Sequence, residues 1–157
     1  MRTDFDMFNS AYFDEWAPYE EVAASLVDMA AEYLDSGYHF REMASLESAL
    51  SLLEELESSV SSYVPAFTQV RELKDAYLRR IRCLREILIR FQSLSFLISF
   101  SSGSIDFYKA QQISDEIEYY IDQLEYWSDI FSKRWDALNS ITYTGLSSQY
   151  RGLFLFI

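Results

Sequence analysis

Apolar residues recur at spacings of three and four along most of the chain. This spacing places them on one face of an α-helix, whereas a half-buried strand would alternate every second residue. The longest pattern runs over more than four heptads: Ala110, Ile113, Ile117, Tyr120, Leu124, Trp127, Phe131, Arg134, Leu138 and Ile141. Nine of these ten positions are apolar or aromatic. Such a sustained repeat predicts a long helix over about 105–143 that packs at a shallow angle against another long helix.

A second long helix is predicted over about 66–100. Its apolar face has the same spacing and consists of Val70, Leu73, Tyr77, Ile81, Leu84, Leu88 and Phe91. Only a short serine-rich segment with Gly103 separates it from the following helix, and a short loop favours antiparallel neighbours. We therefore expect residues 66–143 to form a long helical hairpin.

The first 60 residues predict shorter helices. Residues 1–16 read as a short helix or N-terminal arm, and residues 17–60 as a helical hairpin that turns at Gly37. Pro18 suits the first turn of a helix, so we expect a new helix to begin at Ala17 or Pro18. Its apolar stripe is predicted to consist of Tyr19, Val22, Leu26, Met29 and Tyr33.

Serine and glycine mark two further boundaries in this prediction. The run 58–62 contains four serines and precedes Pro65, and it predicts a loop because serine competes for backbone hydrogen bonds. Gly145 is expected to end the last helix, which leaves residues 145–157 as an apolar tail. The fold class is therefore all-α: an antiparallel helical bundle of about four to five helices in one domain, 1–157.

The last five residues form an apolar end that should not remain in water. They are Leu153, Phe154, Leu155, Phe156 and Ile157. An exposed run of this kind is an aggregation hazard. We expect it to dock on the bundle or to join two copies as a homo-oligomer.

Charge is distributed unevenly along the chain, whose formal net charge is -12. Residues 1–60 carry -12, residues 61–100 carry +4 and residues 101–157 carry -4. The seven basic residues of the middle stretch are Arg71, Lys74, Arg79, Arg80, Arg82, Arg85 and Arg90. We interpret this as a basic helix surrounded by acidic ones, which makes the bundle internally complementary. A charged partner is the alternative.

One flank of the basic helix mixes charge with aliphatic residues. It consists of Arg71, Lys74, Leu78, Arg82, Arg85 and Ile89. A face that met only water would have no reason to carry two aliphatic side chains. The flank is therefore predicted to contact neighbouring helices or a partner, and it is a candidate partner-binding site.

No catalytic site, metal site or cofactor is predicted, and we expect a protein that is not an enzyme. The single histidine, His39, cannot supply the two Glu-x-x-His motifs of a di-iron bundle. Cys83 lies among arginines, which could lower the pKa of its thiol, but we interpret it as a small buried residue. One cysteine and the absence of any apolar run near 20 residues predict a soluble, cytoplasmic protein that does not cross a membrane.

Acidic and aromatic residues together suggest a protein-interaction module. A first candidate patch consists of Asp4, Phe5, Asp6, Phe8, Tyr12, Asp14, Glu15, Trp16, Glu20 and Glu21. A second acidic face consists of Asp115, Glu118, Asp122, Glu125 and Asp129. The partner is predicted to be a protein with a basic surface. In a narrower form, the chain is an inhibitor that blocks a nucleic-acid-binding protein by mimicking nucleic-acid charge.

Other hypotheses remain beside this one. The acidic residues could serve only to keep an aromatic-rich protein in solution. The chain could be an architectural or oligomerising subunit of a larger complex, and a helical enzyme or small-ligand carrier is a weaker alternative. Direct nucleic-acid binding is disfavoured because the sequence pI is near 4.4, whereas nucleic-acid-binding domains are typically basic.

Overall fold

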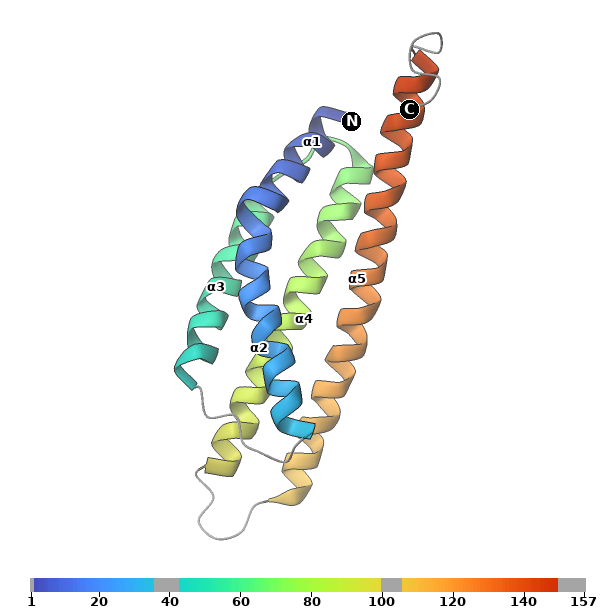
Figure 1. Ribbon diagram of the computed structural model, residues 1–157. Coiled ribbons are helices and arrows are strands. Elements are labelled where there is room, and N and C mark those ends of the chain that lie inside the picture. Colours follow the sequence, from blue (N-terminus) through green and yellow to red (C-terminus); the bar gives the residue numbers. More distant parts are fainter. Residues whose placement is uncertain (1, 36–42, 100–105, 150–157) are drawn as a thin grey trace.

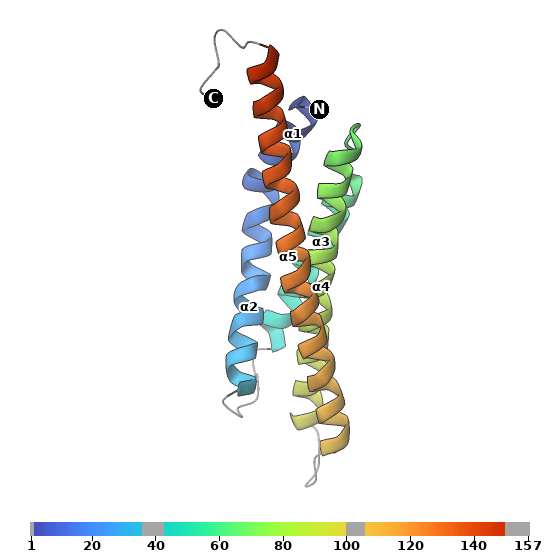
Figure 2. The ribbon, with the colours of Figure 1, turned by 90° about the vertical axis from the view of Figure 1, so that its right-hand side faces the viewer.

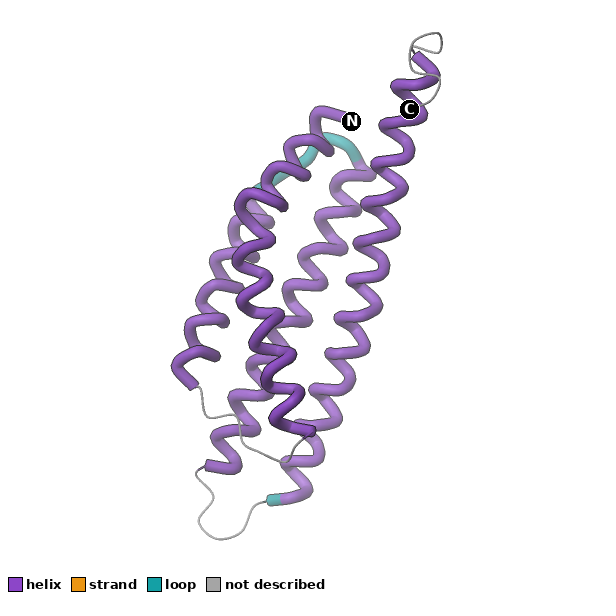
Figure 3. Tube along the Cα trace, viewed as in Figure 1, coloured by secondary structure: helices purple, strands orange, loops and turns teal. Residues whose placement is uncertain are grey.

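The computed structural model describes residues 2–35, 43–99 and 106–149. In this part of the chain the α-helices are α1 (Arg2–Ala11), α2 (Ala17–Asp35), α3 (Met43–Ser62), α4 (Thr68–Ser99) and α5 (Phe107–Gln149). A π-helical turn, η1 (Tyr12–Trp16), joins α1 to α2. The described residues contain no strand (Figure 3). The predicted all-α bundle is confirmed.

Helix α4 lies at the centre of the bundle. It contacts α1, α2, α3 and α5, and its contact with α5 is the most extensive among the described elements. Helix α5 runs antiparallel along nearly the whole length of α4, as the short segment between them predicted (Figures 1 and 2). The C-terminal turns of α5 extend beyond the other helices (Figure 1).

An aromatic cluster fills the core where α1, η1, α4 and α5 meet. Phe8 and Trp16 lie 5.3 Å apart between ring centroids, and Tyr77 and Phe131 are also 5.3 Å apart. Trp135 of α5 closes the cluster against Phe8 at 6.1 Å. Aromatic pairs in such geometries contribute about 0.5–1.5 kcal/mol each beyond their buried area. The N-terminal segment is thus held to the hairpin of α4 and α5 through its aromatic side chains.

The predicted helix start at Ala17 is confirmed, because α2 begins there, but Pro18 does not separate α2 from the segment before it. Helices α1, η1 and α2 form one continuous, bent rod (Figure 1). Proline lacks an N–H group, and its ring clashes with the carbonyl four residues earlier. The π-helical turn widens the helix immediately before it, because the Ala17 N–H bonds to the Tyr12 carbonyl five residues back. The chain therefore passes through the proline without leaving the helix.

The predicted apolar stripe of α2 is only partly buried. Leu26 lies in the core, but the side chains of Tyr19, Val22 and Met29 are exposed. The buried face instead contains Glu20, whose partner Arg80 comes from α4. Apolar spacing alone could not indicate a carboxylate that faces the core.

Two predicted helix ends are wrong: the serine run 58–62 is not a loop, and Gly145 does not end the last helix. Helix α3 continues through the serine run to Ser62, where Val60 is fully buried. The Ser62 hydroxyl donates a hydrogen bond to the Ser58 carbonyl at 2.8 Å, so it bonds within the helix rather than opposing it. Helix α5 continues through Gly145 to Gln149, since one glycine costs a long helix only about 1 kcal/mol.

Some predictions concern positions outside the described residues. These are the turn at Gly37, the histidine His39, the loop around Gly103 and the apolar end 153–157.

Candidate functional site

All seven basic residues of α4 have partners within the chain. Arg79 pairs with Asp75 at 3.1 Å, and Arg90 bonds to Glu116 of α5 at 3.0 Å and also pairs with Glu86. Arginines of α4 also lie over aromatic rings, with Arg79 4.6 Å from the centroid of Trp127. The positive charge of the central helix is therefore largely met by carboxylates and rings of the same bundle.

The predicted basic flank faces α3. The Lys74 Nζ donates to the carbonyls of Ser61 and Tyr63 at 3.0 and 2.5 Å, and so satisfies carbonyl groups at the C-terminal end of α3. Arg82 and Arg85 both bind the carboxylate of Glu57. The flank is mainly an internal contact between two helices.

The remaining members of the flank are divided between core and surface. Leu78 is buried, whereas Ile89 is 37% exposed. Arg71 is exposed and donates to the Ala66 carbonyl at 3.1 Å. Leu78 is therefore part of the core, whereas Ile89 lies at the surface. The basic side chains described for this flank all bond to groups of the bundle.

The first acidic and aromatic patch does not form a surface of the kind expected. Phe5, Phe8 and Trp16 are at most 4% exposed and lie in the aromatic core, and Tyr12 is half-buried beside them. These rings cannot anchor a partner without unfolding the bundle. Their spacing indicated a helix correctly, but burial by α4 and α5 was not visible in the sequence.

Three carboxylates of that patch, Asp4, Glu15 and Glu20, bond to groups of other helices or of the segment before α4. The Asp4 Oδ2 accepts a hydrogen bond from the Phe67 N–H at 2.8 Å, just before α4 begins. Glu15 Oε1 accepts from the Ser59 hydroxyl at 3.2 Å. The patch members Asp6, Asp14 and Glu21 are exposed, with Asp6 in a surface ion pair to Arg2.

Glu20, the third of these carboxylates, forms a buried ion pair with Arg80. The Arg80 Nε lies 2.6 Å from Glu20 Oε1, and the two side chains are 20% and 6% exposed. The hydroxyl of Tyr77 and Glu20 Oε2 are buried nearby without a hydrogen bond among the described residues. Burial, reinforced by the charge of Glu20, raises the pKa of Tyr77 and of Tyr12 above the usual tyrosine value. This cluster joins α2 to α4, and its carboxylate is buried.

The second predicted acidic face is a surface. Its five members, Asp115, Glu118, Asp122, Glu125 and Asp129, are all exposed. At 100° and 1.5 Å per residue they fall within an arc of about 80° and extend over about 21 Å. They lie on the side of α5 opposite the buried positions Ile117 and Phe131.

The carboxylates of this row differ in their partners. Asp115 accepts a hydrogen bond from Gln111 at 2.9 Å, and Asp129 pairs with Lys133 at 2.8 Å. Among the described residues, no basic side chain pairs with Glu118, Asp122 or Glu125. This arrangement differs from that of Glu20 or Glu57, whose charges are used inside the bundle.

Two exposed tyrosines within the row were not among the predicted site residues. Tyr119 and Tyr126 are 57% and 55% exposed. Each is four residues after one aspartate of the row and three before the next, so it lies on the same side of α5 as the carboxylates. A sequence signal for them exists: Glu-Tyr followed by a second aromatic residue occurs at 118–120 and again seven residues later at 125–127. We call Asp115, Glu118, Tyr119, Asp122, Glu125, Tyr126 and Asp129 the outer face of α5.

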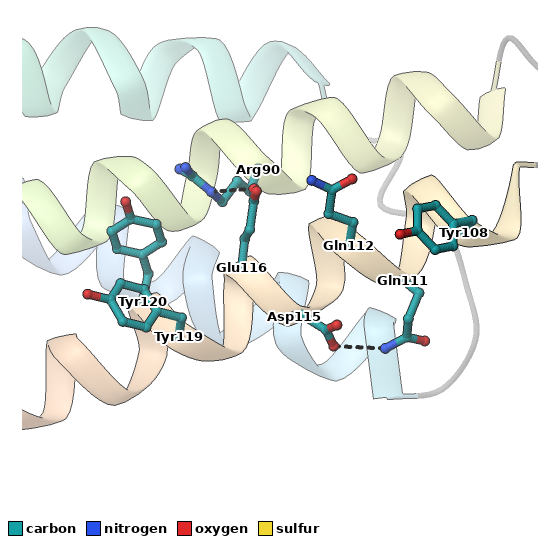
Figure 4. Close-up of a pocket in the computed structure, with 8 residues that line it drawn as sticks. All are labelled: Arg90, Tyr108, Gln111, Gln112, Asp115, Glu116, Tyr119 and Tyr120. Atoms are coloured by element: carbon teal, nitrogen blue, oxygen red, sulfur yellow. Dashed lines mark hydrogen bonds and ion pairs between the residues drawn. The ribbon is translucent and has the colours of Figure 1, made fainter.

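An open pocket of about 490 Å³ adjoins the N-terminal part of the outer face. Its lining includes Asp115 and Tyr119 of the outer face, together with Tyr108, Tyr120 and Arg90 (Figure 4). Arg90 reaches from α4 to Glu116, and its guanidinium lies 4.4 Å from the centroid of Tyr120. The pocket thus connects the outer face to the seam between α4 and α5.

Metal ligands and the single cysteine are the remaining reactive groups of the described residues. They contain no cluster of three or more His, Cys, Asp or Glu side chains arranged to hold a metal. Burial, together with the charge of Glu86, raises the pKa of the Cys83 thiol. The interpretation of Cys83 as a small buried residue is confirmed, since it is 7% exposed.

Comparisons with other proteins provide no family. No model of a known protein family matches the chain, and no curated protein or solved structure matches it at a significant level. In the described parts of the chain, no helix is long and apolar enough to cross a membrane. Function must be inferred from the outer face and its surroundings.

Proposed function

We propose that this chain is a protein-interaction module that binds a basic protein through the outer face of α5. The observation that carries this proposal is the exposed central row of Glu118, Asp122 and Glu125, without internal counter-charges among the described residues and interleaved with two exposed tyrosines. Carboxylates supply attraction to a basic surface, while tyrosine is a residue type enriched at protein interfaces.

The outer face is a better candidate than the other exposed acids. Helix α3 also exposes Glu47, Glu54 and Glu55, but no large exposed aromatic residue lies among them. A solubilising surface needs charge only, whereas a binding surface also needs groups that bury area against a partner. The combination of carboxylates and rings favours binding at α5.

The narrower inhibitor proposal concerns what kind of basic surface is bound. Five carboxylates over about 21 Å give one charge per about 5 Å, whereas each strand of duplex DNA carries one per about 3.4 Å. The outer face is therefore a sparser row of charge with rings between the charges. This fits a partner groove that uses both basic and aromatic contacts, as single-strand-binding proteins do.

Affinity capture with matched variants tests the proposal. Wild-type protein, a variant of the outer face (Glu118→Gln, Asp122→Asn, Glu125→Gln) and a control variant of α3 (Glu47→Gln, Glu54→Gln, Glu55→Gln) are used as bait in extracts of the source cells. Both variants lose three charges.

We expect wild type and the α3 variant to retain a basic protein that the α5 variant does not retain. Its retention should decrease as salt rises. Equal loss with both variants, or none with either, contradicts the proposal. The inhibitor form further requires that the chain displaces nucleic acid from the captured protein.

The architectural alternative has one observation in its favour. Tyr19, Val22 and Met29 form an exposed apolar stripe on α2 that the bundle leaves uncovered among the described residues. Light scattering of wild type and of a Val22→Glu, Met29→Glu variant tests it. An oligomer that dissociates in the variant supports assembly, and a monomer at high concentration in both contradicts it.

A further inference from the structure

The outer face repeats with a period of seven residues. Asp115, Glu118 and Tyr119 recur as Asp122, Glu125 and Tyr126. The exposed fractions of the two tyrosines agree within two percentage points. In each repeat the next residue is an aromatic side chain that turns inward. The two repeats are thus alike in sequence and in the exposure of their tyrosines.

The inward aromatic residue of each repeat binds an arginine of α4. Arg90 lies 4.4 Å from the centroid of Tyr120, and Arg79 lies 4.6 Å from that of Trp127. Each of these arginines also pairs with a carboxylate, Glu116 for Arg90 and Asp75 for Arg79. The bundle therefore holds arginine with a ring and a carboxylate together, twice, on the inner side of the same two repeats.

The outer tyrosines offer the same combination without an arginine. Tyr119 is flanked by Asp115 and Asp122, four residues before it and three after, and Tyr126 is flanked by Asp122 and Asp129 in the same way. Asp129 pairs with Lys133, so Asp122 is the carboxylate beside Tyr126 that has no basic partner among the described residues. The outer ring of each repeat packs edge-on against the inner ring, with centroids 5.1 Å apart in both repeats. Because the inner rings are held by α4, the outer rings are preorganised, which lowers the entropic cost of binding.

One heptad after Tyr126, the position of the outer tyrosine is taken by a lysine. Lys133 stands seven residues after Tyr126 and pairs with Asp129 at 2.8 Å. There the carboxylate has an internal partner, whereas the carboxylates of the two preceding repeats have none from a basic residue among the described residues. Charge complementarity therefore points to an external cation at Tyr119 and another at Tyr126.

We propose that the outer face of α5 binds two arginine side chains of a helical segment in the basic partner, seven residues apart in that segment. The two subsites are about 10.5 Å apart along α5, which matches two turns of a partner helix. Arginine fits better than lysine because its planar guanidinium stacks on a ring and bonds to a carboxylate at the same time. The first subsite also opens into the pocket beside Tyr108, which gives room for a neighbouring side chain. This inference rests on the proposed function and specifies its partner.

Synthetic helical peptides test the spacing. The first peptide carries two arginines at positions i and i+7, the second has the same composition with arginines at i and i+5, and the third has lysines at i and i+7. Affinity is measured by fluorescence anisotropy at low salt. We expect the first peptide to bind roughly tenfold or more tightly than the second, because arginines five residues apart point to different sides of a helix.

Variants of the tyrosines test the rings. Tyr119→Leu with Tyr126→Leu should weaken the first peptide by roughly 5- to 30-fold, as expected for two lost cation–π contacts. Tyr119→Phe with Tyr126→Phe keeps the rings and should stay within about twofold of wild type. Circular dichroism confirms that both variants remain helical.

Several results would overturn the inference. Equal affinity for the i+7 and i+5 peptides, a lysine peptide that binds as well as the arginine one, no effect of the leucine variant, or no binding of any peptide would each do so. The proposed function is decided separately by affinity capture. If the acidic variant loses its basic partner while the leucine variant retains it, the function stands and the paired arginine subsites do not.

Discussion

Removing the carboxylate of Glu20 should destabilise the bundle severely. This side chain is 6% exposed and pairs with Arg80 of α4, so it links α2 to the central helix. Glu20→Ala leaves the guanidinium in the aromatic core without its counter-charge. The cost of a broken buried pair is mainly that of an unpaired buried charge, about 3–5 kcal/mol.

The structure places the expected value near the lower end of that range. Arg80 is 20% exposed, so part of the guanidinium can regain water after the change. We expect a loss of about 3 kcal/mol, which is a large share of the 5–15 kcal/mol typical of a domain. With a urea dependence of about 2 kcal/mol per molar, the unfolding midpoint should fall by about 1.5 M.

Urea unfolding followed by circular dichroism measures this shift. The matched control is Glu55→Ala, which removes an exposed carboxylate from α3 and should change stability by less than about 0.5 kcal/mol. A Glu20→Leu, Arg80→Met double variant replaces both charges by apolar groups and should recover most or all of the stability. If Glu20→Ala proves as mild as Glu55→Ala, the account of a buried ion pair in the core is refuted.

Three further predictions concern the interior and the N-terminal contacts. Because burial raises the pKa of Tyr77 while unfolded tyrosine ionises near pH 10, stability should fall above about pH 10 by about 1.4 kcal/mol per pH unit. Tyr77→Phe should reduce that slope in alkaline urea titrations, and an unchanged slope would contradict the assignment. Cys83 should react with a thiol reagent only after unfolding, since it is 7% exposed and burial raises its pKa; rapid labelling of folded protein would be inconsistent with this. Asp4→Ala should cost about 1 kcal/mol in urea unfolding by removing the acceptor for the Phe67 N–H, whereas no loss would show that this bond is unimportant.

The fold was largely predictable because apolar spacing reports helices directly. The heptads from Ala110 onward gave the long α5 and its antiparallel packing on α4. Helix ends were less predictable. Pro18 is accommodated by a π-helical turn, and Gly145 lies inside a helix, because local preferences of about 1 kcal/mol yield to the packing of a long helix.

Predicting the site required knowing which side of each helix meets a neighbour. Acidic and aromatic residues at helical spacing occur both in the N-terminal segment and in α5. In the first, Phe8 and Trp16 are buried in the bundle and both contact Tyr77 of α4; in the second, Tyr119 and Tyr126 remain outside. The sequence contains the same residue types in both places, and only the tertiary contacts distinguish core from surface.

The most direct test of the account is to map where a basic ligand binds on the folded chain. Backbone amide chemical shifts of isotope-labelled protein are followed by NMR during titration with the helical peptide that carries arginines at i and i+7. We predict that the largest shift changes cluster at residues 115–129 and disappear in the Glu118→Gln, Asp122→Asn, Glu125→Gln variant. Changes of equal size around Glu47, Glu54 and Glu55 of α3 would contradict the claim that the outer face of α5 is the binding surface.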